Sequence, residues 1–350
     1  MRNTPLLHLV RLACASCLVL LAARADAYDV GQFVSSVFDA SRSREIAYTL
    51  YYPEGYAGVS HVLLFSHGGA GSPTGHTRLG HFGTRWAAAG YVGIHVNHLE
   101  SGAGSLHTRD TPADVSFVLD RLQAGTLPLP PEFAGSLALS AFGHAGHSFG
   151  AYTSMALAGG QYLGQPSFRD PRIVAVAPVS PQGAGEFGGF DAGPAQNTWW
   201  GIDVPVFDLV GALEKDSNAI GTIQEEDWRL TPFLRFPDVA DKFQVILPGQ
   251  DHGHMGALAL PAVQQYVAEN TRLFFDVYLR GQSAGVCGIG TSPAFPGQVL
   301  AARSDPVLGL ASACDPPVGA PRAVPLPGFV GAGIALALLG IARRSRPLSP

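Results

Sequence analysis

Short apolar runs alternate with amphipathic stretches through the middle of the chain. The runs with the length and composition of buried strands lie at 60–69, 92–98, 136–145, 172–180, 204–211 and 242–249, after an earlier strand at 44–55. Apolar positions at helical spacing lie at 81–91, 111–123, 151–160 and 262–281. Because Thr111-Pro112 is a typical helix start, we expect the second helix to begin there. This alternation predicts an α/β fold with a mainly parallel sheet and helices on both faces.

The N-terminal segment has a different pattern. Arg11 precedes the apolar stretch LACASCLVLLAA, and Ala25-Asp26-Ala27 fits a small-x-small cleavage site. We therefore expect residues 1–27 to be a secretory signal peptide, followed by one large α/β domain at 28–282.

The C-terminal segment carries a second apolar stretch, GFVGAGIALALLGIA, between the sequence VPLP at 324–327 and an arginine cluster at 343–346. Residues 323–350 resemble a PEP-CTERM sorting signal of the VPLP type. The resemblance implies a transmembrane helix, a transient membrane anchor and an exosortase-type processing enzyme as partner. A plain tail anchor is the alternative. Either places the body of the protein outside the cytoplasm, in the periplasm, at the cell surface or beyond.

Composition narrows the choice of partners and compartment. Charged residues make up 14% of the chain, the net charge is -5, and no basic patch is present, so we do not expect a nucleic-acid partner. Removal of the signal peptide would leave Cys287 and Cys314 as a pair. In an oxidising compartment these predict a disulfide that staples the loop-rich linker at 283–322.

The pattern G-x-S-x-G occurs twice, around Ser148 and around Ser283. A nucleophile elbow needs a strand, a sharp turn and a helix in that order. Ser148 follows the apolar run at 136–145 and precedes the helix predicted at 151–160, whereas Ser283 follows a helix and precedes a loop. We therefore predict Ser148 as a nucleophile and Ser283 as a helix-exit turn.

A serine nucleophile needs a histidine base and a carboxylate that orients it, in the chain order Ser, acid, His for this kind of elbow. His252 lies just after the last apolar strand and is favoured over His254 as the base. The acid should follow the strand at 204–211, where Asp216 is favoured and Glu214 is the alternative.

The oxyanion of acyl transfer needs two backbone N–H donors. We assign them to Phe149, directly after the nucleophile, and to Gly69 in the glycine-rich turn at 66–71 into which the apolar run leads. Trp199 and Trp200 are candidates for lining a substrate pocket or for covering the sheet.

From Arg44 to Gly281 these motifs resemble the α/β-hydrolase superfamily, and most closely its predicted dienelactone hydrolase and platelet-activating-factor acetylhydrolase-like branch. True dienelactone hydrolases use cysteine where this chain has Ser148, so that particular reaction is not implied. The resemblance implies an exported serine hydrolase that cleaves carboxylic esters through an acyl-enzyme, without a cofactor. Alternatives are a lactonase, polyester hydrolase or peptidase of the same fold, or a non-catalytic surface or binding protein. The histidines include no HExxH-type helix, so we expect no metal site.

Overall fold

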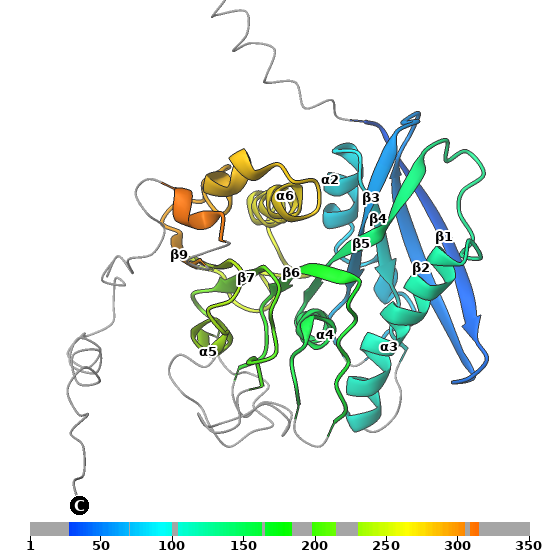
Figure 1. Ribbon diagram of the computed structural model, residues 1–350, viewed down its shortest axis with the longest axis horizontal. Helices are drawn as coiled ribbons and strands as arrows, with labels where there is room; N and C mark the ends of the chain where they lie inside the picture. The colour runs from blue at the N-terminus through cyan, green and yellow to red at the C-terminus, as the bar shows by residue number, and fades with distance from the viewer. Residues whose placement is uncertain are drawn as a thin grey trace, which may run out of the picture. The chain divides into compact units, whose positions relative to one another are not determined.

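A single nine-stranded sheet organises the part of the chain that the structure describes (Figure 1). The computed structural model describes residues 28–69, 71–99, 104–162, 165–183, 198–214, 230–304 and 309–314. The predicted signal peptide at 1–27, the sorting segment at 323–350 and Asp216 lie outside the described residues.

The strands follow the order β1-β2-β4-β3-β5-β6-β7-β8-β9. Their bounds are β1 Val30–Asp39, β2 Arg44–Pro53, β3 Val59–Ser66, β4 Val92–Val96, β5 Ser136–His147, β6 Ile173–Val179, β7 Val206–Gly211, β8 Lys242–Leu247 and β9 Val299–Arg303. Neighbouring strands from β4 through β8 pair in parallel, while β1, β2 and β9 pair antiparallel. The chain therefore passes from β3 outward to β4 and then returns to β5 on the other side, so its direction through the sheet reverses beside β3.

Helices cover both faces of the sheet, as Figure 1 shows. Their bounds are α2 His81–Ala88, α3 Gly104–Gln123, α4 Phe149–Ala158, α5 Thr231–Arg235 and α6 Pro261–Tyr278. Apolar side chains of α2 and α6 form one core layer with Phe65 and Phe207, and those of α3, α4 and α5 form the other with Leu64 and Val176. The predicted fold class, α/β with a mainly parallel sheet, is confirmed.

Helix α3 corrects the expectation that a helix begins at Thr111-Pro112. The helix starts at Gly104, and Pro112 lies inside it. A proline inside a helix cannot donate to the carbonyl four residues earlier. That carbonyl, on Thr108, instead accepts a hydrogen bond of 2.7 Å from the Tyr152 hydroxyl of α4. A tertiary contact therefore replaces the hydrogen bond within the helix that Pro112 cannot give to the Thr108 carbonyl.

The sheet is also wider than the sequence pattern indicates. The edge strands β1 and β9 were not predicted. β1 pairs with β2 over its full length, from Val30 opposite Pro53 to Asp39 opposite Arg44. β9 is a short strand of five residues, and it pairs antiparallel with β8.

Residues after α6 are tied together covalently. Cys287 lies in the 3-10 helix η4 (Ser283–Gly288), Cys314 follows the 3-10 helix η5 (Ala311–Ala313), and the two form a disulfide with a Cα–Cα distance of 5.4 Å. This confirms the predicted pair. No helix in the described ranges is both long enough and apolar enough to cross a bilayer.

Candidate active site

Ser148 stands at the turn between β5 and α4, with the backbone strain expected of a nucleophile elbow. Its φ is 56°, a region that non-glycine residues rarely adopt. The flanking glycines are required by close packing: a Cβ on Gly146 would lie 2.3 Å from the carbonyl oxygen of Gly150, and one on Gly150 would lie 1.9 Å from that of Ser66. The glycines of the motif therefore permit the sharp turn that lifts Ser148 above the end of the sheet.

Ser283 has none of this context. It is an exposed residue at the start of η4, just beyond the end of α6. The sequence reading of Ser283 as a helix-exit turn agrees with this position.

His252 brings an imidazole to the nucleophile. It lies in the loop after β8, and its Nε2 is 2.9 Å from Oγ of Ser148. His254, the competing candidate, faces elsewhere: its Nδ1 lies 2.8 Å from Oδ1 of Asp251, and its side chain is 43% exposed. The geometry therefore favours His252 over His254 as a base for Ser148.

The carboxylate that meets His252 is that of Glu214. Its Oε2 lies 3.2 Å from Nδ1 of His252, and its side chain is fully buried. Its Oε1 accepts hydrogen bonds of 2.7 Å from the Ser180 hydroxyl and from the Gly211 N–H. Because a carboxylate bound in this way accepts, Nδ1 of His252 carries the proton and Nε2 is left to accept from Ser148.

The geometry favours Glu214, the alternative that the sequence left open, while the preference for Asp216 stays a prediction. Glu214 occupies the position next to His252, and Asp216 lies outside the described residues. The physical reason is the tight turn after β7, in which the Glu214 N–H donates to the Gly211 carbonyl. From this turn a glutamate reaches the histidine directly. The sequence signal was present, since Glu214 stands three positions after Gly211.

The glycine-rich turn after β3 lies against the nucleophile. A Cβ on Gly68 would come within 2.9 Å of Cβ of Ser148. Gly69 has a φ of 87°, which favours glycine. Phe149 is the first residue of α4, so its N–H lies at the helix start directly after Ser148. The assignment of Gly69 and Phe149 as oxyanion donors stays a prediction; Phe149 directly follows Ser148, and Gly69 directly follows Gly68.

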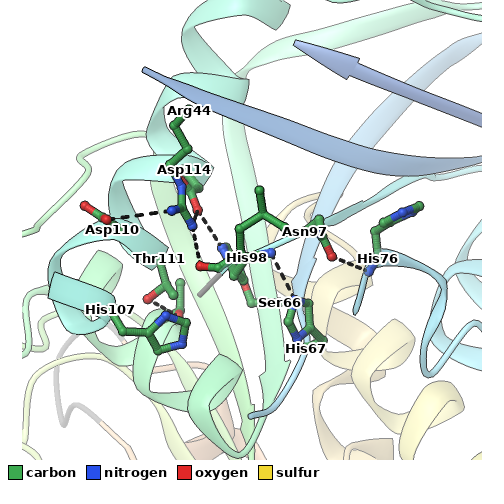
Figure 2. A network of polar contacts seen from close by, with 12 residues as sticks. Arg44, Ser66, His67, His76, Asn97, His98, His107, Asp110, Thr111 and Asp114 are labelled. Atoms are coloured by element: carbon green, nitrogen blue, oxygen red, sulfur yellow. Dashed lines mark hydrogen bonds and ion pairs between the residues drawn. The ribbon is translucent and has the colours of Figure 1, made fainter. Parts of the chain in front are cut away.

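Figure 2 shows a network of polar contacts, which was not predicted from the sequence. Asp114 of α3 binds Nδ1 of His98 at 3.1 Å and the Arg44 guanidinium at 2.9 Å. Burial alone would raise the pKa of Asp114, but its bonds to His98 and Arg44 outweigh burial and lower it. The sequence signal was the number of histidines, 12 in the chain.

The network continues toward α4 through two serines. Nε2 of His98 lies 2.8 Å from Oγ of Ser66, which in turn lies 3.0 Å from Nε2 of His144. Nδ1 of His144 lies 2.8 Å from Oγ of Ser154. Asp114, His98 and Ser66 thus repeat the order of a catalytic triad, but Ser66 is completely buried and out of reach of a substrate. Burial lowers the pKa of His144 to about 3, so this histidine is neutral and serves the packing of α4.

The residue before the nucleophile contacts the base. Nε2 of His147 lies 3.1 Å from the carbonyl oxygen of His252, and the two rings lie 4.9 Å apart. The His147 ring also packs against Gly256, because a Cβ on Gly256 would lie only 2.4 Å from Cε1 of that ring. His147 therefore links the elbow to the loop that carries His252.

The two tryptophans differ sharply in exposure. Trp199 is fully buried in the core layer that includes α4, and Trp200 is 70% exposed. A substrate-binding role for either stays a prediction. Among the described residues, no group of three or more His, Cys, Asp or Glu side chains is arranged to hold a metal ion.

Comparison with protein-family models and with curated proteins found no match for this chain. Its activity must therefore be argued from the chemistry of the site.

Proposed function

We propose that this protein is a serine hydrolase that cleaves carboxylic esters through an acyl-enzyme. The observation that carries the proposal is one continuous series of hydrogen bonds, from Oγ of Ser148 to His252 and from His252 to Glu214. The series joins a strained serine, an imidazole and a buried carboxylate, which are the parts of a catalytic triad.

The first half of the reaction forms the acyl-enzyme. Oγ of Ser148 attacks the ester carbonyl carbon while Nε2 of His252 takes the hydroxyl proton. Glu214 stabilises the imidazolium that results. When the tetrahedral intermediate collapses, the bond to the alcohol oxygen breaks and His252 gives the proton to that leaving group.

The second half returns the enzyme to its starting state. Water attacks the acyl carbon, and His252 takes one of its protons. Collapse of the second tetrahedral intermediate releases the carboxylic acid, and the proton passes back to Oγ of Ser148. In both halves the negative oxygen would lie between the N–H groups assigned to Gly69 and Phe149.

The wider context supports placing the chain in the α/β-hydrolase superfamily. Ser148 follows β5, Glu214 follows β7 and His252 follows β8, in the order typical of that fold. All three lie where the carboxyl ends of parallel strands meet, which is where open α/β sheets bind ligands. A lactonase or polyester hydrolase would use the same residues with a different leaving group.

We further propose that the enzyme is exported. The Cys287–Cys314 disulfide is typical of oxidising compartments, and the sequence signals at 1–27 and 323–350 add a route for export, transient anchoring and processing by an exosortase-type enzyme. Intact-mass analysis of protein from its native host tests this. A form that begins at Met1, retains Arg343 to Pro350 and has free thiols at Cys287 and Cys314 would contradict export.

The activity is tested with purified protein and a series of p-nitrophenyl esters of increasing acyl length. We expect turnover that varies with acyl length, because a pocket beside Ser148 must accept the acyl chain. No turnover of any ester, lactone or polyester in a protein that is folded would contradict the proposal.

A further inference from the structure

The peptide between Gly68 and Gly69 is held by the side chain of the residue before it. Nδ1 of His67 lies 2.9 Å from the carbonyl oxygen of Gly68. A trans peptide is planar, and its N–H points opposite to its C=O. A bond that fixes the Gly68 carbonyl therefore also fixes the direction of the Gly69 N–H.

His67 is in turn fixed by the residues that follow β4. The backbone N–H of His98 donates to Nε2 of His67 over 3.0 Å, as Figure 2 shows. Because Nε2 accepts, the proton of the neutral ring is on Nδ1, where it donates to Gly68. Burial, with a further contribution from His98, lowers the pKa of His67 to about 3, so the ring keeps this single tautomer at neutral pH.

The His67 ring is also packed closely on one face. Gly75, in the 3-10 helix η1 (Gly75–Thr77), lies against the ring, and a Cβ there would come within 2.1 Å of Nε2. The ring is thus held by hydrogen bonds on both nitrogens and by packing on one face.

A second histidine holds the other side of Gly69. Nε2 of His107, on α3, lies 3.3 Å from the carbonyl oxygen of Gly69. The His107 ring also packs on the Phe149 ring with 4.4 Å between centroids, and His107 is only 3% exposed. One side chain therefore contacts both residues to which we assign an oxyanion donor.

We propose that His67 and His107 are positioning residues of the oxyanion hole, which together fix the carbonyls on either side of the Gly69 Cα. Gly69 needs such support, because a glycine at positive φ has the widest choice of conformations. The inference rests on the proposed function, since an oxyanion forms only when Ser148 attacks an acyl group.

The direction of these hydrogen bonds adds to the effect. The His98 N–H donates to His67, His67 donates to the Gly68 carbonyl, and the same peptide presents the Gly69 N–H. Hydrogen bonds that run in one direction polarise one another, which makes the last N–H a stronger donor. A stronger N–H donor stabilises the substrate oxygen most when that oxygen carries a full negative charge, as in the transition state. We therefore expect the effect in kcat rather than in KM.

The test compares variants that remove each donor with variants that keep it. His107→Leu removes the donor to Gly69, whereas His107→Gln places an amide nitrogen near the position of Nε2. His67→Phe removes both bonds of that ring, whereas His67→Asn keeps a donor near the position of Nδ1. His61→Phe, at the opposite end of β3 from the site, is the matched control. Each variant is measured for kcat, KM, affinity for a trifluoromethyl ketone and thermal unfolding.

We expect His107→Leu and His67→Phe to lower kcat by about 10- to 100-fold, with KM changed by less than about 3-fold. Affinity for the ketone, whose adduct with Ser148 carries an oxyanion, should fall by a similar factor. His107→Gln and His67→Asn should recover most of both, and His61→Phe should match the wild type.

Equal losses in the Leu and Gln variants of His107, or wild-type kcat in the variants that lack a donor, would overturn the inference. If His67→Phe does not fold, the His107 pair decides the question alone. Failure of the proposed function looks different, because the folded wild type would then turn over no ester, or hydrolysis would survive Ser148→Ala.

Discussion

Glu214 and His252 come from loops 38 positions apart, yet Oε2 of one lies 3.2 Å from Nδ1 of the other. The contact is possible because β7 and β8 are adjacent parallel strands, from Val206 opposite Lys242 to Gly211 opposite Leu247. Both loops therefore begin at the same edge of the sheet. Backbone bonds from Ala212 to Leu247 and from Leu213 to Gln250 hold the two loops together before either side chain is considered.

This contact predicts which acid the enzyme uses. Glu214→Gln should lower kcat by about 10³- to 10⁴-fold, because the amide no longer holds His252 in the right tautomer. Asp216→Asn, the matched change at the residue that the sequence favoured, should cost less than about 10-fold. Steady-state kinetics with one soluble ester decide between them, and the reverse ranking would show that the acid is misassigned.

The identity of the base is tested by comparing two histidines of the loop after β8. His252→Ala should reduce kcat by several orders of magnitude, because the members of a triad act as a unit. His254→Ala removes an imidazole that bonds only Asp251 among the contacts described, so activity should stay within a few-fold of the wild type. Comparable losses in the two variants would count against the site as described.

Stability in acid should depend on a cluster between α2 and α6. Burial alone would raise the pKa of Glu269, but bonds to Arg272 and Arg85 outweigh burial and lower it to about 2 from an ordinary value of 4.5. A carboxylate with a lowered pKa stabilises the fold above its unfolded pKa, and this contribution is lost as pH falls toward the folded value. The free energy of unfolding of the wild type should therefore exceed that of Glu269→Gln most clearly above about pH 5.

The difference should shrink steadily between about pH 4.5 and pH 2 in urea unfolding experiments. Glu45→Gln, at an exposed carboxylate that bonds the Ser36 hydroxyl, is the control and should differ little from the wild type. A Glu269→Gln difference that does not change with pH would contradict the assigned pKa.

The sequence predicted the central strands, the elbow at Ser148 and the position of His252, because each has a strong local signal. An apolar run marks a buried strand, glycines mark a tight turn, and a polar loop after a strand marks the ligand edge of the sheet. It did not predict the start of α3, because the contact between Tyr152 and the Thr108 carbonyl that satisfies the helix around Pro112 joins residues far apart in the chain.

The preference for Asp216 over Glu214 stays a prediction, because Asp216 lies outside the described residues, but the described geometry favours Glu214. Residue type favoured aspartate. Which carboxylate can contact His252, however, depends on the turn at Gly211 and on how closely the loops after β7 and β8 approach one another. The histidines that support the site were missed. His67 and His98 lie after different strands, and only the parallel pairing of β3 and β4 brings them together.

The central claim is that Ser148 attacks the substrate, and labelling with a fluorophosphonate probe tests it most directly. The probe forms a covalent bond with an activated serine, and peptide mass spectrometry identifies the residue that carries it. We predict a single adduct on Ser148 in the wild-type protein, no adduct in Ser148→Ala, and unchanged labelling in Ser283→Ala. Labelling that persists in Ser148→Ala, or that falls on Ser283, would contradict the account.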